Sequence, residues 1–300
     1  MRVASIGACG SAQTFGVERP ICGLSPAETL RRRRQRDATV LPPTRSLREP
    51  SVATFDPAAA PTPRNRLLAA LPPEDLALLW PQLSPVELPF RQTLHMPEEP
   101  IRAVYFPETG YISRLSPMED GDFAEVGLVG PEGMTGLAPL LGADTDSFEM
   151  LVQVPGTAFR MDAGAFREAL DRIPAFRPLL NRYALAHFEQ VARTGACNGR
   201  HHTDQRLARW LLMAHDRVER EPFPMTHEFL SMMLGVRRAG ITVAAGTLQK
   251  AGLIRYERGR MEITDRPGLE AASCECYGTA RRAYDRLLGP PEAARRPYWG

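Results

Sequence analysis

The sequence has no long hydrophobic run and no recognisable signal peptide. No stretch approaches the roughly 20 apolar residues that a membrane-spanning helix needs. The opening residues, MRVASIGACGSAQTFG, contain one basic residue and no sustained apolar core. The hydrophobic content of 43% is enough for ordinary buried cores. A chain of 300 residues with these properties predicts a cytosolic protein of about two domains plus some loosely structured chain.

Cysteine is scarce and scattered, with five residues at Cys9, Cys22, Cys197, Cys274 and Cys276. An odd, dispersed set does not form a disulfide framework, and free thiols fit a reducing cytosol. An iron–sulfur cluster needs about four thiolates at short spacings, whereas Cys197 stands alone in the sequence. The Cys274-x-Cys276 pair could coordinate a metal or become oxidised. Without a nearby histidine or further cysteine, however, we expect free thiols and no metal site.

Signatures of catalysis are also missing. The sequence contains no Gly-x-Ser-x-Gly motif, no phosphate loop and no evident pair of catalytic carboxylates. The glycine-rich segment GPEGMTG (130–136) lacks the lysine of a phosphate loop. His95 is the only histidine in the strand-rich region and is expected on the surface or in a turn, so a cupin-type metal cluster is excluded. We therefore do not expect an enzyme.

The net charge of +2 is the sum of segments with opposite net charge along the chain. Residues 61–199 carry 11 basic and 18 acidic groups, whereas residues 200–300 carry 17 basic and 12 acidic groups. An acidic middle beside a basic C-terminal third indicates a polyanion partner for the latter only, the alternative being ordinary solvated surface.

The N-terminal residues 1–63 are predicted to be disordered. They contain RRRRQRD, LPPTRSLREP and DPAAAPTPR and show no apolar periodicity. The Arg31–Arg34 run could bind phosphate, but we expect a solvated tail. A further alternative is that part of this segment is wrongly translated upstream sequence.

Helical and strand-like patterns alternate through the rest of the chain. Residues 64–83 predict one or two short helices from the spacing of Leu67, Leu68 and Leu71. Between 86 and 161, short strand-like runs alternate with turns, which predicts a sandwich or jelly roll. Five glycines fall where these turns would need positive φ, namely Gly110, Gly121, Gly130, Gly133 and Gly142.

Two helices are predicted next, over 162–173 and 177–198, separated by the helix-breaking Pro174. The second carries a stripe with the 4-3-4-3 spacing of a coiled-coil seam. We expect this stripe to dimerise, with packing against the chain's own domain as the alternative; its residues are Leu180, Ala184, His187, Val191 and Thr194.

A helix-turn-helix followed by a hairpin is predicted over 203–263. Thr226 is a plausible N-cap of the first helix, and Gly235 permits the tight turn. In the second helix Ile241, Ala245 and Leu248 should face inward, which leaves its arginine-rich start facing outward. That end of a recognition helix meets base edges in the major groove, where arginine pairs with guanine. Gly252 should end this helix, and a hairpin tip around 258–260 can lie on phosphates. The candidate DNA-contacting residues are Thr226, Arg237, Arg238, Gly240, Thr242, Arg255, Arg258 and Arg260. The alternative is a winged helix used only for protein contacts.

Four segments carry a resemblance to a known family: YFPETGYIS, VGLVGPEGMTGLAPLLGAD, QRLARWLLMAHDRV and MLGVRRAGITVAAGTLQKAGLIRYERGRMEI. Together they resemble bacterial transcriptional regulators of the cyclic-AMP receptor protein and fumarate-nitrate regulator (Crp/Fnr) family, over roughly residues 64–288. The resemblance implies an α+β chain with a jelly-roll, cyclic-nucleotide-binding-like sensor domain (64–162) and helices that include a dimerisation helix (163–200). A winged helix-turn-helix (201–288) and a tail (289–300) would follow. It also implies a homodimer on a near-palindromic operator of double-stranded DNA, with recognition helices about 34 Å apart, and RNA polymerase as a further partner. The rival hypothesis is a scaffold or anti-regulator that does not read DNA.

The resemblance also shows departures from the family pattern. Relatives often begin the recognition helix with Arg-Glu-Thr or Arg-Ala-Ser, whereas here Ala239 and Gly240 follow Arg238. Gly240 and Gly246 each cost a helix about 1 kcal/mol relative to alanine, so this helix is expected to need its neighbours or DNA to be well formed. Relatives that bind cyclic AMP hold its phosphate with a Gly-Glu-Leu turn and an Arg-Ser pair, but here Ala138 follows Gly136-Leu137, and no arginine lies between Arg114 and Arg160. A cyclic nucleotide is therefore not expected as a cofactor, and no other cofactor is indicated.

Overall fold

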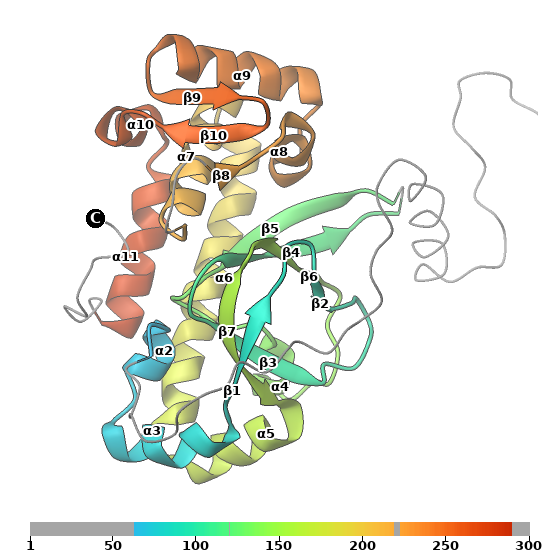
Figure 1. Cartoon of the computed structure of the whole chain (residues 1–300), viewed down its shortest axis with the longest axis vertical. Helices are drawn as coiled ribbons and strands as arrows, with labels where there is room; N and C mark the ends of the chain where they lie inside the picture. The colour runs from blue at the N-terminus through green and yellow to red at the C-terminus, as the bar shows by residue number, and fades with distance from the viewer. Residues whose placement is uncertain (1–62, 120, 219–222, 290–300) are drawn as a thin grey trace, which may run out of the picture. The chain divides into compact units, whose positions relative to one another are not determined.

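The computed structural model describes residues 63–119, 121–218 and 223–289, all within one compact unit, and is shown in Figure 1. Residues 1–62 of the expected extension (1–63) and residues 290–300 of the expected tail (289–300) therefore lie outside the described residues, and so do Cys9, Cys22 and the Arg31–Arg34 run. Among the residues described, no helix is both long enough and apolar enough to span a membrane.

Two antiparallel sheets form the β-roll in the first half of the described chain. One sheet has the strand order β1-β7-β3 and the other β2-β6-β4-β5. Apolar side chains, among them Val86, Ile112 and Val152, fill a core that both sheets share. This confirms the jelly-roll prediction; the strands are β1 (Ser84–Leu88), β2 (Thr93–His95), β3 (Ala103–Pro107), β4 (Tyr111–Pro117), β5 (Phe123–Val129), β6 (Glu149–Val154) and β7 (Gly156–Asp162).

Short helices precede the β-roll along the chain, and longer helices follow it (Figure 1). Asp162 caps α5 by accepting a hydrogen bond from the Gly164 amide, and the chain breaks around Pro174 as predicted before the 25-residue helix α6 begins. Leu67, Phe166 and Phe176 pack in one core with residues of α6. The helices are α2 (Arg66–Ala69), α3 (Pro73–Leu79) with the short turn η1 (Trp80–Gln82), α4 (Leu137–Leu140), α5 (Ala163–Arg172) and α6 (Phe176–Arg200).

A winged helix-turn-helix follows α6. Its three-stranded sheet has the order β8-β10-β9, and a core around Leu211, Leu230 and Ile241 holds its helices together. Tyr111, Leu115 and Leu128 of the β-roll belong to the same core. The elements are α7 (Thr203–His215), β8 (Phe223–Pro224), α8 (His227–Leu234), α9 (Arg238–Lys250), β9 (Ile254–Glu257), β10 (Arg260–Ile263), α10 (Arg266–Ala272) and α11 (Cys276–Leu288).

Two of the five turn glycines serve a different purpose from the one predicted. Gly110, Gly121 and Gly142 have positive φ, but Gly130 and Gly133 do not. A Cβ atom on Gly133 would lie 2.4 Å from the Tyr183 hydroxyl, and one on Gly130 would lie 2.8 Å from the Arg217 side chain. The segment between β5 and α4 therefore needs these glycines because other parts of the chain approach its backbone closely.

Two histidines are buried, contrary to expectation. His95 is expected at the surface or in a turn, but it ends β2 and is 7% exposed. His187 is 2% exposed, and burial lowers its pKa to about 3. Burial also lowers the pKa of His95, to about 4, so both rings are neutral at physiological pH.

Candidate nucleic-acid interface

Helix α8 begins and ends as its sequence predicts. The Thr226 hydroxyl caps it by accepting a hydrogen bond from the Phe229 amide at 3.1 Å, and Gly235 ends it with φ of 59°. Leu230, Met233 and Leu234 are buried. The left-handed glycine turns the chain sharply, so that α9 starts three residues later.

Helix α9 presents one face to the core and one to solvent. Ile241, Ala245 and Leu248 are buried as predicted, and Gly252 follows the helix with φ of 75°. Arg237, Arg238 and Thr242 are exposed, and Gly240 is half-buried. The helix is continuous through Gly240 and Gly246, and a Cβ atom on either would meet nothing within 4 Å.

Val243 is an exposed residue of α9 that was not among the predicted DNA contacts. Its side chain is 71% exposed on the outer face of α9, beside Thr242. An apolar side chain on the outer face of a recognition helix suits the methyl group of thymine. The signal was available in the sequence, because Val243 lies five residues after Arg238 and two after the buried Ile241.

The start of α9 combines features that attract an anion. Arg237 occupies the N-cap position but offers no side-chain acceptor to the first amides, and Arg238 opens the helix. Neither the first turn nor the cap contains an acidic residue. Positive side chains at the positive end of a helix dipole destabilise it by a few tenths of a kcal/mol. An anionic partner would turn this cost into an attraction.

The wing is a hairpin of β9 and β10 with a two-residue turn that contains an arginine. Arg260 pairs with Glu257 across the hairpin, and the tip residues Arg258 and Gly259 both have positive φ, at 49° and 75°. The Arg258 side chain is exposed there, whereas Arg255 forms an ion pair with Glu262 at 3.1 Å. Arg258 is therefore better placed than Arg255 to meet a phosphate.

His227 joins the wing to the recognition helix. Its ring stacks on Tyr256 of β9 with centroids 4.4 Å apart, and its Nδ1 lies 3.1 Å from the Thr242 hydroxyl of α9. The Gly259 carbonyl accepts a hydrogen bond from the Met225 amide at 2.7 Å, directly before the N-cap Thr226. The Thr242 hydroxyl also donates to the Arg238 carbonyl, which leaves its methyl group for an outside contact. These contacts bring the outer face of α9 and the wing to one end of the domain, where α9 lies against the hairpin in Figure 1.

Two parts of the chain match models of known domain families. Residues 85–173 match the model of the cyclic nucleotide-binding domain, and residues 205–272 match that of the Crp-like helix-turn-helix domain. The chain belongs to the Crp/Fnr family. This family consists of transcriptional regulators rather than enzymes.

Solved structures share the fold of this Crp/Fnr chain at low sequence identity. FixK2 from Bradyrhizobium japonicum is 15% identical, with a TM-score of 0.56, over 64% of this chain and 98% of FixK2. A CRP-family transcriptional regulator from Thermus thermophilus is 19% identical, with a TM-score of 0.51, over 64% of this chain and 96% of that one. The c-di-GMP responsive regulator CLP from Xanthomonas campestris is 13% identical, with a TM-score of 0.51, over 63% of this chain and 98% of CLP. No curated protein matches the sequence.

The stripe predicted as the dimer seam of this Crp/Fnr chain lies largely within the chain itself. Leu180, His187 and Thr194 are buried within the chain, and Ala184 and Val191 are half-buried. His187 lies against the β-roll, where a Cβ atom on Gly127 would be 3.3 Å from its ring. The alternative of packing against the chain's own domain is therefore the one the structure supports for this stripe.

A second stripe on α6 faces outward with the same 4-3-4-3 spacing. Its apolar members Leu185 and Phe188 are 46% and 67% exposed. Small residues continue the stripe towards the end of the helix, which would let a second helix approach closely. The exposed stripe consists of Asn181, Leu185, Phe188, Ala192, Gly195 and Gly199.

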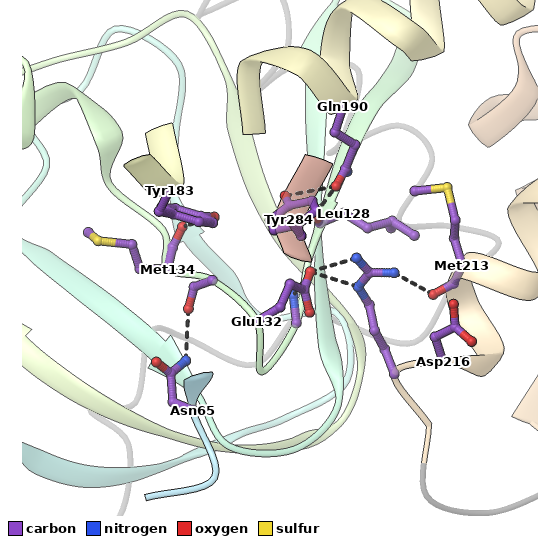
Figure 2. A network of polar contacts seen from close by, with 12 residues as sticks. Asn65, Leu128, Glu132, Met134, Tyr183, Gln190, Met213, Asp216 and Tyr284 are labelled. Carbon is purple, nitrogen blue, oxygen red and sulfur yellow. Dashed lines mark hydrogen bonds and ion pairs between the residues drawn. The ribbon is translucent and has the colours of Figure 1, made fainter. Parts of the chain in front are cut away.

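Arg217, which follows α7, connects the winged helix to the β-roll. Its guanidinium donates to the Glu132 carboxylate at 2.9 and 2.6 Å and to the Met213 carbonyl at 2.6 Å. Both side chains of this ion pair are almost fully buried. Figure 2 shows Glu132 and Met213 on opposite sides of this contact. No local pattern in the sequence indicates this pair, because its members lie 85 residues apart.

Neighbouring polar contacts extend this connection to α6 and α11. The Tyr284 hydroxyl of α11 donates to the Gln190 side chain of α6 at 2.9 Å, and Gln190 donates to the Leu128 carbonyl of β5 at 3.2 Å. The Tyr183 hydroxyl donates to the Met134 carbonyl at 2.9 Å. Figure 2 shows these residues around the same junction. The β-roll, the long helix and the C-terminal helix therefore meet in one polar network.

Glu125 is a second buried group between the β-roll and the winged helix. Its carboxylate accepts hydrogen bonds from the Ser113 hydroxyl of β4 and the Trp210 indole of α7, each at 2.6 Å. Burial raises its pKa from 4.5 to about 7, although both hydrogen bonds and the charges of Arg209 and Arg217 oppose the rise. The folded chain therefore binds a proton at Glu125 more tightly than the unfolded chain does.

We expect Glu125 to make stability depend on pH. Stability from its protonation is fully present below pH 4.5 and is lost as the pH rises towards 7, because the unfolded chain then ionises this carboxyl more readily. A Glu125→Gln variant should gain stability relative to the parent between pH 5 and pH 8, by on the order of 3 kcal/mol. Urea unfolding at both pH values measures this difference. Equal shifts of parent and variant across that range would contradict the assignment.

The cysteines lie closer to other metal-binding side chains than the sequence predicted. The expectation of free thiols without a metal site rested on Cys274 and Cys276 having no histidine or further cysteine nearby. The structure places Cys197 and His201 beside them. All three cysteines described are buried.

Proposed function

We propose that the chain is a sequence-specific DNA-binding transcriptional regulator that binds a near-palindromic operator as a homodimer. The observation that carries the proposal is the exposed start of α9, with Arg237, Arg238 and Thr242, joined through His227 to the wing. Side chains at the start of a recognition helix can reach base edges, while a wing can follow the phosphate backbone.

The outward stripe of α6 supports the homodimer. A seam around Leu185 and Phe188 would remove two exposed apolar side chains from water. Two copies joined along this helix would each contribute one recognition helix. Their half-sites would lie about one helical turn, 34 Å, apart.

Cyclic nucleotides are not part of the proposal. Arg114, the last arginine before the altered phosphate cassette in the sequence, is buried and forms an ion pair with Asp146 at 3.2 Å. The Phe148 ring covers its guanidinium at 4.6 Å. The carboxylate already occupies the place that a phosphate would need on this arginine.

Selection from a random pool of DNA duplexes tests the function directly. The purified chain, without added ligand and at physiological salt, should enrich an inverted repeat with half-sites one helical turn apart. Enrichment of single half-sites would contradict the dimer. Weak, salt-sensitive binding without a preferred sequence would favour the rival scaffold or anti-regulator.

The two arginine positions should respond differently to truncation. Arg238→Ala should cost about 1–3 kcal/mol of binding free energy and relax the preference at one position of each half-site. Arg258→Ala should weaken binding to all sequences alike, because a phosphate contact carries no sequence information. Repeating the selection with each variant, and titrating the selected site over a range of salt, measures both effects. An unchanged preference in Arg238→Ala would show that α9 does not read bases through this residue.

A further inference from the structure

Three buried cysteines from distant parts of the chain meet at the end of α6. Cys197 lies in the last turn of α6, whereas Cys274 and Cys276 lie between α10 and the start of α11. They form a small cluster of their own, and the sulfur atoms of Cys197 and Cys274 are 3.5 Å apart. Free cysteines are often buried as small apolar residues, so the cluster alone does not identify a ligand.

His201 makes the cluster into a four-donor set. It follows α6 directly, and its Nδ1 lies 3.7 Å from the sulfur of Cys276. One donor atom from each of the four residues lies within 4.8 Å of all the others. A tetrahedral zinc ion, with bonds of about 2.3 Å to sulfur and 2.0 Å to nitrogen, separates its ligand atoms by roughly 3.5–3.8 Å. The two separations given above fall within this range.

The other side of the imidazole supplies an independent observation. The Nε2 atom of His201 lies 3.3 Å from a carboxylate oxygen of Glu275. Histidines that bind a metal through one ring nitrogen usually donate the other N–H to a carboxylate or carbonyl, which fixes the tautomer. Glu275 therefore holds the proton on Nε2 and leaves the Nδ1 lone pair facing the three sulfurs.

We propose that Cys197, His201, Cys274 and Cys276 form a Cys₃His site for a single zinc-class divalent ion. Three thiolates and one imidazole are a ligand set typical of closed structural zinc sites.

Two other uses of the cysteines fit the geometry less well. An iron–sulfur cluster spreads its ligands over two or more irons, and four donors so close together suit one ion better. A disulfide between Cys197 and Cys274 would not explain why Cys276 and His201 also lie close to each other.

The position of the site gives the ion a structural role. Cys197 and His201 lie at the end of α6, while Cys274 lies between α10 and α11 and Cys276 begins α11. An ion bound to all four would clamp the long helix to the C-terminal part of the winged helix. Because ion binding to the folded chain alone stabilises that chain, chelation should lower the unfolding temperature.

Metal content and cobalt substitution test the site without any reading of DNA. The full-length chain, purified anaerobically, should contain one zinc ion per chain when measured by inductively coupled plasma mass spectrometry. After chelation has removed the zinc, Co²⁺ should bind at the same site. The complex should show the visible bands of tetrahedral cobalt together with a thiolate charge-transfer band. Chain without bound metal and without a thiolate–cobalt band would overturn the proposal. So would acid-labile sulfide with iron, or a Cys197–Cys274 disulfide in the anaerobic protein.

Matched variants locate the ligands. Cys274→Ser and His201→Asn should lose the metal, whereas His202→Asn, which changes the exposed neighbouring histidine, should keep it. Glu275→Gln should retain the cobalt spectrum but weaken metal affinity about 10–100-fold. Since this variant alters only an exposed side chain, it remains informative if the ligand variants fail to fold. Metal retained at full affinity in Cys274→Ser, His201→Asn and Glu275→Gln would place the metal elsewhere.

Discussion

A Phe188→Asp variant should be monomeric and should lose most of its affinity for a two-half-site operator. Phe188 is 67% exposed in the middle of the outward stripe of α6. A carboxylate there would have to be buried without a partner if two copies met along this helix. Losing the second half-site removes the gain from joining two binding events, about 10²–10⁴-fold in affinity. Analytical ultracentrifugation and titration of the selected operator measure the two effects.

Leu78→Asp is the matched control for this variant. Leu78 is 63% exposed on α3, away from the stripe, and the same substitution there should leave both assembly and operator affinity unchanged. His187 belongs to the inner stripe and is unsuitable as a control, because its substitution would disturb the core. A dimeric Phe188→Asp variant with full operator affinity would show that the seam lies elsewhere.

A Glu132→Gln variant should lose about 3–5 kcal/mol of stability. The substitution leaves the Arg217 guanidinium buried without its counter-charge, and breaking a buried pair on one side is far more costly than losing an exposed one. Because the pair joins the segment after β5 to the end of α7, the loss should also loosen the connection between the β-roll and the winged helix. Urea unfolding gives the change in free energy, and hydrogen exchange at residues 130–134 and 213–217 locates it.

Two further variants separate the charge effect from general disruption. Asp171→Asn removes an exposed ion pair with Arg177 and should cost less than about 1 kcal/mol. Replacing Glu132 and Arg217 together by methionine removes both buried charges and should recover much of the loss. If the double variant were as unstable as the sum of the single ones, the ion pair would not be what stabilises this junction.

Local patterns predicted the local structure of the winged helix closely. Thr226 caps α8 and Gly235 makes the turn. Ile241, Ala245 and Leu248 of α9 face the core of the winged helix. Each of these features depends on neighbours within about one or two helical turns, whose effects are visible in the sequence. The hairpin tip at 258–259 follows from the same kind of signal.

The seam of α6 shows where such patterns stop being sufficient. Two stripes with identical spacing lie one residue apart, which on a helix is a rotation of about 100°. Apolarity favours the stripe through Leu180, and the structure uses that stripe for the core of the chain itself. The stripe through Phe188 remains outside, a choice that depends on where the β-roll packs.

The sequence by itself determined the order of the main elements up to the hairpin and the face of α9 that meets the core, because these follow from periodicity and turn chemistry. Its motifs also indicated the family. Only the tertiary structure decided the orientation of α6, the pairing of Glu132 with Arg217, and the meeting of Cys197 and His201 with Cys274 and Cys276. These contacts join residues more than 70 positions apart in the chain. No local pattern encodes such a distance, because it is fixed by how sheets and helices pack around shared cores.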